Sequence, residues 1–115
     1  MISKQSEILG SYEKMAQAAG VACAFIGHAG NGILTTFILE SGAAKTDPLA
    51  ELIEKFTAEA VKQDGNLVVE SCPTELKAKI NVWGRPRTDL VVMRRLKEQV
   101  DPVGVLNPGR FVGGI

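Results

Sequence analysis

The sequence predicts an α+β fold in which helices pack on one face of an antiparallel sheet. Apolar residues recur at helical spacing between residues 6 and 19 and again between residues 49 and 60. Two strand-like apolar runs flank an Asn-Gly pair at residues 31–32, which is the strongest short signal for a hairpin. Helices and a hairpin that alternate along one short chain favour the α+β class.

The first helix is expected over residues 6–19. Ser3 or Ser6 can cap its N-terminus through a side-chain oxygen. Gly20 is placed to end it, because glycine adopts the left-handed conformation of a helix C-terminus without strain. The two strands of the hairpin are expected to follow over residues 21–29 and 33–40.

The turn of this hairpin decides which side chains face one another. If Asn31 and Gly32 are its two central residues, both take positive φ angles. The strands then pair so that His28 lies directly opposite Thr35, on the same face and about 5 Å away.

The second half of the sequence predicts two more helices and one more strand. A helix is expected from Asp47, which can cap it, through Pro48 in its first turn to an end near Gly65. Residues 66–72 predict a third strand. A short final helix is expected over residues 90–100, where the following Asp-Pro pair stops it.

The order of these elements is that of a ferredoxin-like split β-α-β unit without its first strand. That strand would lie inside the sheet, so its absence would leave two strand edges unpaired. We therefore expect either a fragment or a chain that obtains the strand from another chain. The gap could be filled by residues 78–83, by residues 1–5 or by a second copy. A homodimer is the expected result, because pairing between copies needs no new loop closure.

The composition excludes several classes of function. Thirteen basic residues balance thirteen acidic ones, so the chain lacks the strong field that would bind nucleic acid or an anionic membrane. Cys23 and Cys72 stand far apart, as buried thiols of a cytosolic protein do. No apolar run approaches the roughly 20 residues of a membrane span, and the first residues lack the apolar centre of a signal peptide. A cytoplasmic protein is expected.

The C-terminal third carries a resemblance to a known family. The run LKEQVDPVGVLNPGRFVGGI at residues 96–115, with NVWG at 81–84 and VVMRRLKEQ at 91–99, resembles the end of FAD-linked oxidases of the vanillyl-alcohol oxidase type. Within that family it is most similar to FAD-binding subunits of glycolate oxidases. The resemblance is specific at the tail and weaker upstream.

This resemblance implies that residues 1–115 form one C-terminal cap domain, without the glycine-rich half that binds the flavin pyrophosphate. The parent enzyme would be an FAD-dependent oxidoreductase that moves a hydride from a small 2-hydroxy acid, such as glycolate, to the flavin. The fragment alone would hold no FAD and would not be active. Its partners would be the flavin-binding half and other oxidase subunits, including an iron–sulfur subunit, in the cytoplasm or at the inner face of the membrane.

His28 is the candidate catalytic residue, with a structural histidine at a strand end as the alternative. Relatives of this type carry the motif HxGDGNxH at this position. Its two histidines could bind one divalent metal ion across the hairpin. In this chain Asn31 replaces the turn carboxylate and Thr35 the second imidazole. One nitrogen ligand is too little for tight binding, so no metal site is expected.

The resemblance also places Asn107, Gly109 and Arg110 on the flavin side of the intact enzyme. The alternative is that Asn-Pro-Gly is simply a turn, in which proline fixes φ and glycine supplies a positive φ. Trp83 could dock against the flavin domain or take part in local packing. The basic residues of the last third are expected to form a solvated face.

A second class of function remains open, namely a stand-alone ferredoxin-like module for oligomerisation or for binding a small ligand. The sequence contains neither a GxSxG elbow nor the spacing of a P-loop or GxGxxG motif. Catalysis by this chain on its own is therefore not expected.

Overall fold

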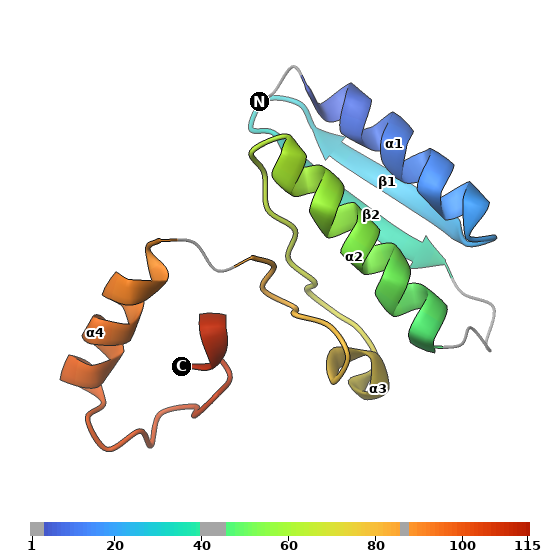
Figure 1. Cartoon of the computed structure of the whole chain (residues 1–115). Coiled ribbons are helices and arrows are strands. Elements are labelled where there is room, and N and C mark those ends of the chain that lie inside the picture. The colour runs from blue at the N-terminus through green and yellow to red at the C-terminus, as the bar shows by residue number, and fades with distance from the viewer. Residues whose placement is uncertain (1–3, 40–45, 86–87) are drawn as a thin grey trace.

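The computed structural model describes residues 4–39, 46–85 and 88–115, and it has an α+β fold (Figure 1). The elements in chain order are α1 (Gln5–Ala18), β1 (Ala22–His28), β2 (Ile33–Leu39), α2 (Thr46–Lys62), α3 (Thr74–Lys77), α4 (Leu90–Val100) and the 3-10 turn η2 (Val112–Gly114).

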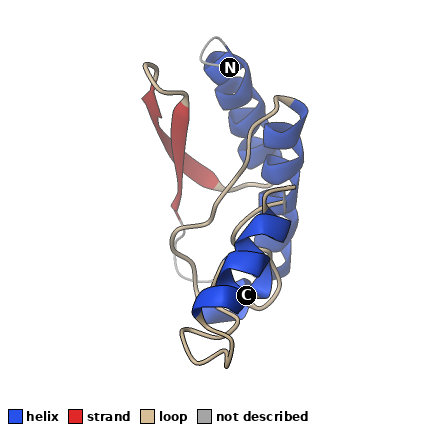
Figure 2. Cartoon of the chain, turned by 90° about the vertical axis from the view of Figure 1, so that its left-hand side faces the viewer, coloured by secondary structure: helices blue, strands red, loops and turns tan. Residues whose placement is uncertain are grey.

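The two antiparallel strands form a sheet with α1 and α2 on one face, as the two perpendicular views show (Figures 1 and 2). Side chains alternate between the faces of the strands. Those of Cys23, Phe25 and Leu34 pack toward the helices. No described element covers the opposite face, where large apolar side chains stay about half exposed: Ile26 (54%), Ile33 (53%), Phe37 (47%) and Leu39 (56%).

The core is centred on the contact between α1 and α2. The Tyr12 ring stacks on the Phe56 ring, with centroids 4.1 Å apart and planes inclined by 10°. The Tyr12 hydroxyl also donates a hydrogen bond of 2.8 Å to the backbone oxygen of Phe56. Such a stack adds about 0.5–1.5 kcal/mol to the gain from burial. Burial raises the pKa of Tyr12 to about 12, and the Glu59 carboxylate adds to the shift.

The helices α1, α2 and α4 and the hairpin strands lie where the sequence predicts them, whereas the short helix α3 was not predicted. Gly20 follows the end of α1 with a φ of 66°, as expected. The caps differ from the expectation. No side-chain hydrogen bond caps α1, Ser6 lies inside the helix, and Ser3 lies outside the described residues. Asp47 is also inside its helix, because α2 begins at Thr46.

The predicted third strand is wrong. Residues 66–72 form no strand in the described part of the chain, although their exposure alternates from Asn66 to Glu70 as in a strand. Their one backbone contact with the returning chain is the hydrogen bond from the Val69 N–H to the Val82 oxygen, 2.7 Å. A strand requires a continuous ladder with a neighbour. The segment has the side-chain pattern of a strand but lacks the neighbour.

The returning chain is held by the NVWG turn. Asn81 accepts a hydrogen bond from the Trp83 N–H (3.1 Å) and donates one to the Gly84 oxygen (2.7 Å). Asn66 donates to the Trp83 oxygen (3.1 Å). Gly84 is buried there with a φ of 74°. A Cβ atom at this position would overlap the Asn66 side chain and the Leu67 oxygen.

The C-terminal part lies apart from the helices and the sheet (Figure 1). No residue of α4 is buried. Trp83 contacts Phe111 of the tail, with ring centroids 5.7 Å apart. The radius of gyration is 16.0 Å, whereas a compact domain of this length has one of about 13 Å. The chain therefore extends well beyond its core.

Replacing Gly84 by alanine is expected to lower the free energy of unfolding by roughly 1–3 kcal/mol, because the change combines a strained φ with a steric overlap. Urea unfolding followed by circular dichroism measures the change. Gly30→Ala is the matched control, since Gly30 lies in an exposed turn with nothing within 4 Å of an added Cβ. Equal stabilities of the two variants would contradict this account of the NVWG turn.

Candidate functional site

His28 is the last residue of β1, and its exposed side chain lies at the end of the open sheet face. The expected register is wrong. His28 pairs with Ile33, and Thr35 pairs with Ile26. His28 and Thr35 share a face but are diagonal neighbours instead of an opposed pair.

The turn explains the shift of register. A two-residue hairpin turn needs positive φ at its first central position, here Asn31, and in the type I′ form at both. Only Gly32 has one, 76°. The chain therefore uses a four-residue loop, in which the His28 oxygen accepts hydrogen bonds from the N–H groups of Asn31 (3.2 Å) and Gly32 (3.1 Å). The Asn31 side chain accepts from the Ile33 N–H (3.3 Å), and Gln5 donates to the Ile33 oxygen (2.7 Å).

The open sheet face is the first candidate site. It combines a continuous apolar surface with two polar side chains, His28 and Thr35, which project on the same side as Ile26 and Ile33. Binding surfaces for cofactors and substrates have this character, with few polar groups on an apolar wall. The arrangement can support a flat ligand or an apolar partner surface, and it offers the imidazole of His28 at its edge.

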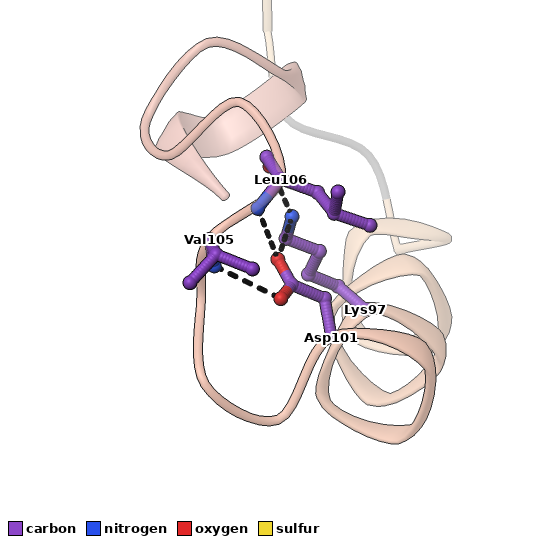
Figure 3. A network of polar contacts seen from close by, with 4 residues as sticks. All are labelled: Lys97, Asp101, Val105 and Leu106. Atoms are coloured by element: carbon purple, nitrogen blue, oxygen red, sulfur yellow. Dashed lines mark hydrogen bonds and ion pairs between the residues drawn. The ribbon is translucent and has the colours of Figure 1, made fainter.

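The second candidate site is the loop after α4, which Asp101 organises (Figure 3). The Asp101 side chain is 3% exposed. It accepts hydrogen bonds from the N–H groups of Val105 and Leu106, both 2.9 Å, and from the Lys97 ammonium group at 2.6 Å. Lys97 also donates to the Leu106 oxygen at 2.5 Å.

These contacts lower the pKa of Asp101 from 3.8 to about 2, with the Lys97 hydrogen bond as the largest cause. The N–H groups of Leu106 and Val105 act in the same direction, against the effect of burial. Sequence reasoning missed this network, since it took Lys97 for part of a solvated face. One signal was available: an aspartate at a helix C-terminus opposes the helix dipole and needs a compensating partner.

The residues expected on the flavin side lie on this loop and are exposed. Asn107 (φ 45°) and Gly109 (φ 70°) have positive φ, and the Arg110 N–H donates to the Asn107 oxygen at 3.2 Å. The expected turn chemistry is therefore present. An open groove of about 460 Å³ runs between α4 and the loop, lined among others by Arg94, Gly109 and Ile115.

The structure does not bring the two candidate sites together. In both views the β1–β2 turn lies at one end of the molecule and the C-terminal segment at the other (Figures 1 and 2). Trp83 lies between them in the sequence and takes part in local packing against Phe111.

Other features of the described residues bear on cofactors and location. Within residues 4–39, 46–85 and 88–115, no group of three or more His, Cys, Asp or Glu side chains could hold a metal ion. Cys23 and Cys72 carry free thiols, and burial raises the pKa of Cys23. None of the helices in these ranges is long and apolar enough to cross a membrane.

Comparison with known families matches residues 2–111 to the FAD linked oxidases, C-terminal domain. The chain belongs to this family. The match covers the hairpin, the core helices and the loop after α4. No curated protein and no solved structure matches the chain. Membership in this C-terminal domain family implies a partner FAD-binding domain and FAD in the parent enzyme.

Acid is expected to open the loop held by Asp101. Because the folded pKa of about 2 lies below 3.8, the carboxylate stabilises the loop above pH 3.8, and this contribution is lost as the pH falls toward 2. The protection factors of the Val105 and Leu106 amides, which compare their exchange rates by NMR with those of an unstructured peptide at the same pH, should fall over this range. Asp101→Asn should show fast exchange already at neutral pH, whereas Asp64→Asn, at an exposed turn, should not. Unchanged exchange in Asp101→Asn would contradict the role of the carboxylate.

The observed register makes a prediction about engineered metal binding. Ile33→His would place a second imidazole directly opposite His28, at the separation two ligands of one zinc ion need. Thr35→His, on the same face but diagonal, is the matched control. We expect zinc to bind Ile33→His about tenfold more tightly or better, as measured by calorimetry, with no stoichiometric binding to the native chain. The opposite order of affinities would show that the strands pair differently.

Proposed function

We propose that this chain is the cap domain of an FAD-dependent oxidase or dehydrogenase that acts on small 2-hydroxy acids, with glycolate as the first candidate. Membership in the C-terminal domain family of FAD-linked oxidases supports the coarse part of this proposal. The resemblance of residues 96–115 to the tail of glycolate oxidase subunits supports the substrate class. On this proposal the chain is not active alone.

The open face of the sheet is the observation that carries the proposal. Helices shield one face only, so Ile26, Ile33 and Phe37 remain half exposed on the other. Burying such side chains is worth about 25 cal/mol for each Å² of apolar surface. A flavin-binding domain seated on this face would gain that energy and enclose His28 at its margin.

The residues of this chain suit the flavin ring and the substrate better than the pyrophosphate. A pyrophosphate site needs a glycine-rich loop that leads into a helix N-terminus. The left-handed glycines Gly104 and Gly109 instead follow a helix and precede only the short η2 turn. The cap would therefore leave the pyrophosphate to its partner.

FAD, when bound by the complete enzyme, supplies the acceptor for the hydride. His28 would hold or accept a proton of the substrate hydroxyl, a role for which enzymes use imidazole side chains most often. Asn107, Gly109 and Arg110 would lie on the flavin side, where the guanidinium of Arg110 can pair with an anion. No metal ion takes part in this proposal.

The same resemblance supports a wider assembly. We propose the flavin-binding half and an iron–sulfur subunit as partners, in the cytoplasm or at the inner face of the membrane through those subunits. Isolated from them, the chain is proposed to form a homodimer through a free strand edge, because two-stranded sheets are marginal on their own.

The proposal predicts activity on reconstitution. The purified chain should be colourless, and mixing it with a separately produced flavin-binding half of a glycolate oxidase should restore glycolate-dependent bleaching of the flavin near 450 nm. His28→Ala should lower kcat/KM by about 100-fold or more, as for a lost general base. Lys62→Ala, an exposed change on α2, is the control and should have no effect.

Three outcomes would contradict parts of the proposal. A stoichiometric yellow colour of the chain alone would show that it binds flavin by itself. An active mixture that oxidises other alcohols but no 2-hydroxy acid would overturn the substrate class and leave the family role intact. Full activity of His28→Ala would remove His28 from the reaction.

A further inference from the structure

The end of the hairpin that carries His28 is held by a side chain from α1. The amide nitrogen of Gln5 donates a hydrogen bond of 2.7 Å to the Ile33 backbone oxygen and a longer one of 3.4 Å to the His28 backbone oxygen. His28 and Ile33 form the last pair of the two strands before the turn. One side chain therefore bridges both strands at the pair that closes the hairpin.

This closing pair depends on backbone contacts rather than on packing. The ends of a two-stranded sheet open most easily. The side chains of His28 and Ile33 project to the open face, away from the core helices, and residues 29–32 of the loop are exposed. Further hydrogen bonds at the pair come from Asn31 and Gly32, which belong to the loop itself. Gln5 differs from these two because it comes from another element.

That element is fixed by the core. Ile8, one turn after Gln5 on α1, packs against the cluster around Tyr12 and Phe56. In Figure 1 the N-terminal end of α1 lies beside the β1–β2 turn. A group on a packed helix is placed more precisely than a group on a loop. Gln5 thus ties the hairpin end to the best-packed part of the molecule.

The amide group of Gln5 suits this contact. Its nitrogen carries two N–H donors, and the two backbone oxygens of His28 and Ile33 are acceptors. A glutamate has the same shape, but its carboxylate only accepts hydrogen bonds and would be repelled by these oxygens. A methionine has a similar length and no donor. The donors can therefore be removed with little change of shape.

We propose that Gln5 is a positioning residue for His28. It fixes the backbone at the end of β1, so that the imidazole stays at the margin of the open face. The part that concerns the reaction rests on the proposed function. Because α1 lies on the opposite face of the sheet, Gln5 does not contact a substrate bound on the open face. It acts only through the backbone oxygens of His28 and Ile33.

The first test measures the mobility of His28 in the full chain. Gln5→Met removes the donors and keeps a good helix former. Gln17→Met, an exposed change on the same helix, is the matched control. We expect a backbone NMR order parameter at His28 of about 0.85 in the native chain and the control, and below about 0.6 in Gln5→Met. Circular dichroism shows that each variant is folded.

An engineered zinc site measures the same placement without the flavin. In the Ile33→His background, zinc needs the native and the introduced imidazole to be held opposite each other. Adding Gln5→Met should lower the zinc affinity about tenfold in calorimetry, as the loss of a supporting contact does at metal sites. Adding Gln17→Met should leave the affinity unchanged. If Ile33→His binds no zinc, the order parameter alone decides.

Kinetics of the reconstituted enzyme separate positioning from general stability. We expect Gln5→Met to lower kcat about tenfold and to leave KM unchanged, because it misplaces a reacting group and removes no contact with the substrate. In a His28→Ala background the same change should have no further effect, since there is no imidazole left to position. A general loss of stability would lower the rate in both backgrounds.

Two results would overturn the proposal. These are an unchanged order parameter at His28 in folded Gln5→Met, and an equal loss of kcat with and without the His28 imidazole. If Gln5→Met does not fold, Gln5→Glu replaces it in the NMR and kinetic measurements, because an acidic residue suits the first turn of a helix. Full activity of His28→Ala would contradict the proposed role of His28 in the reaction and the catalytic purpose of Gln5 with it. An unchanged order parameter would leave the proposed function intact.

Discussion

The contact between Tyr12 and Phe56 is the constraint on which the buried half of the molecule depends. A sheet of two strands has little cohesion of its own. The helices must therefore hold one another, and the stacked rings with the hydroxyl hydrogen bond join α1 to α2 across 44 positions of sequence. Once the helices are joined, Phe25 and Leu34 of the strands pack beneath them. The hairpin is stable because it lies against this pair of helices.

Because both helices lie on one face of the sheet, the other face is left uncovered, although it is apolar. Alternation along a strand places every second side chain away from the helices. Ile26 and Phe37 occupy such positions, where a protein that exposes this face to water would carry polar residues. A domain that works against a flavin-binding partner has a reason to keep them. The exposed helix α4 and the extended shape also suit a chain whose surfaces are covered by a partner domain.

Sequence periodicity was sufficient to find what depends on local order. The helices around Tyr12 and Phe56, the hairpin strands and the left-handed Gly20 follow from spacing and from glycine chemistry. The register of His28 could not be found this way, because one backbone angle at Asn31 decides between a two-residue and a four-residue turn. Residues 66–72 show a different limit. A strand forms only when a second segment pairs with it, and the pattern of one segment does not predict whether that second segment is present.

The same difference between local sequence patterns and contacts made by the folded chain separates the residues of the candidate sites. Asn107 and Gly109 were recognisable from turn chemistry, which is local. The role of Asp101 could not be predicted in this way. It depends on the loop folding back so that the N–H groups of Val105 and Leu106 reach the Asp101 carboxylate, and no periodic pattern in the sequence predicts that fold.

The Asp101 network also affects the order of folding events. Its members lie within ten positions of one another, and a loop of that size closes in about 10–100 ns. The contact between Tyr12 and Phe56 must close a far longer loop, at a higher entropic cost. The C-terminal loop can thus take its shape early and without the core. A partner that binds this loop does not have to order it, because the loop has already lost its conformational entropy during folding. Less of the contact energy is then spent on ordering, and the affinity is higher.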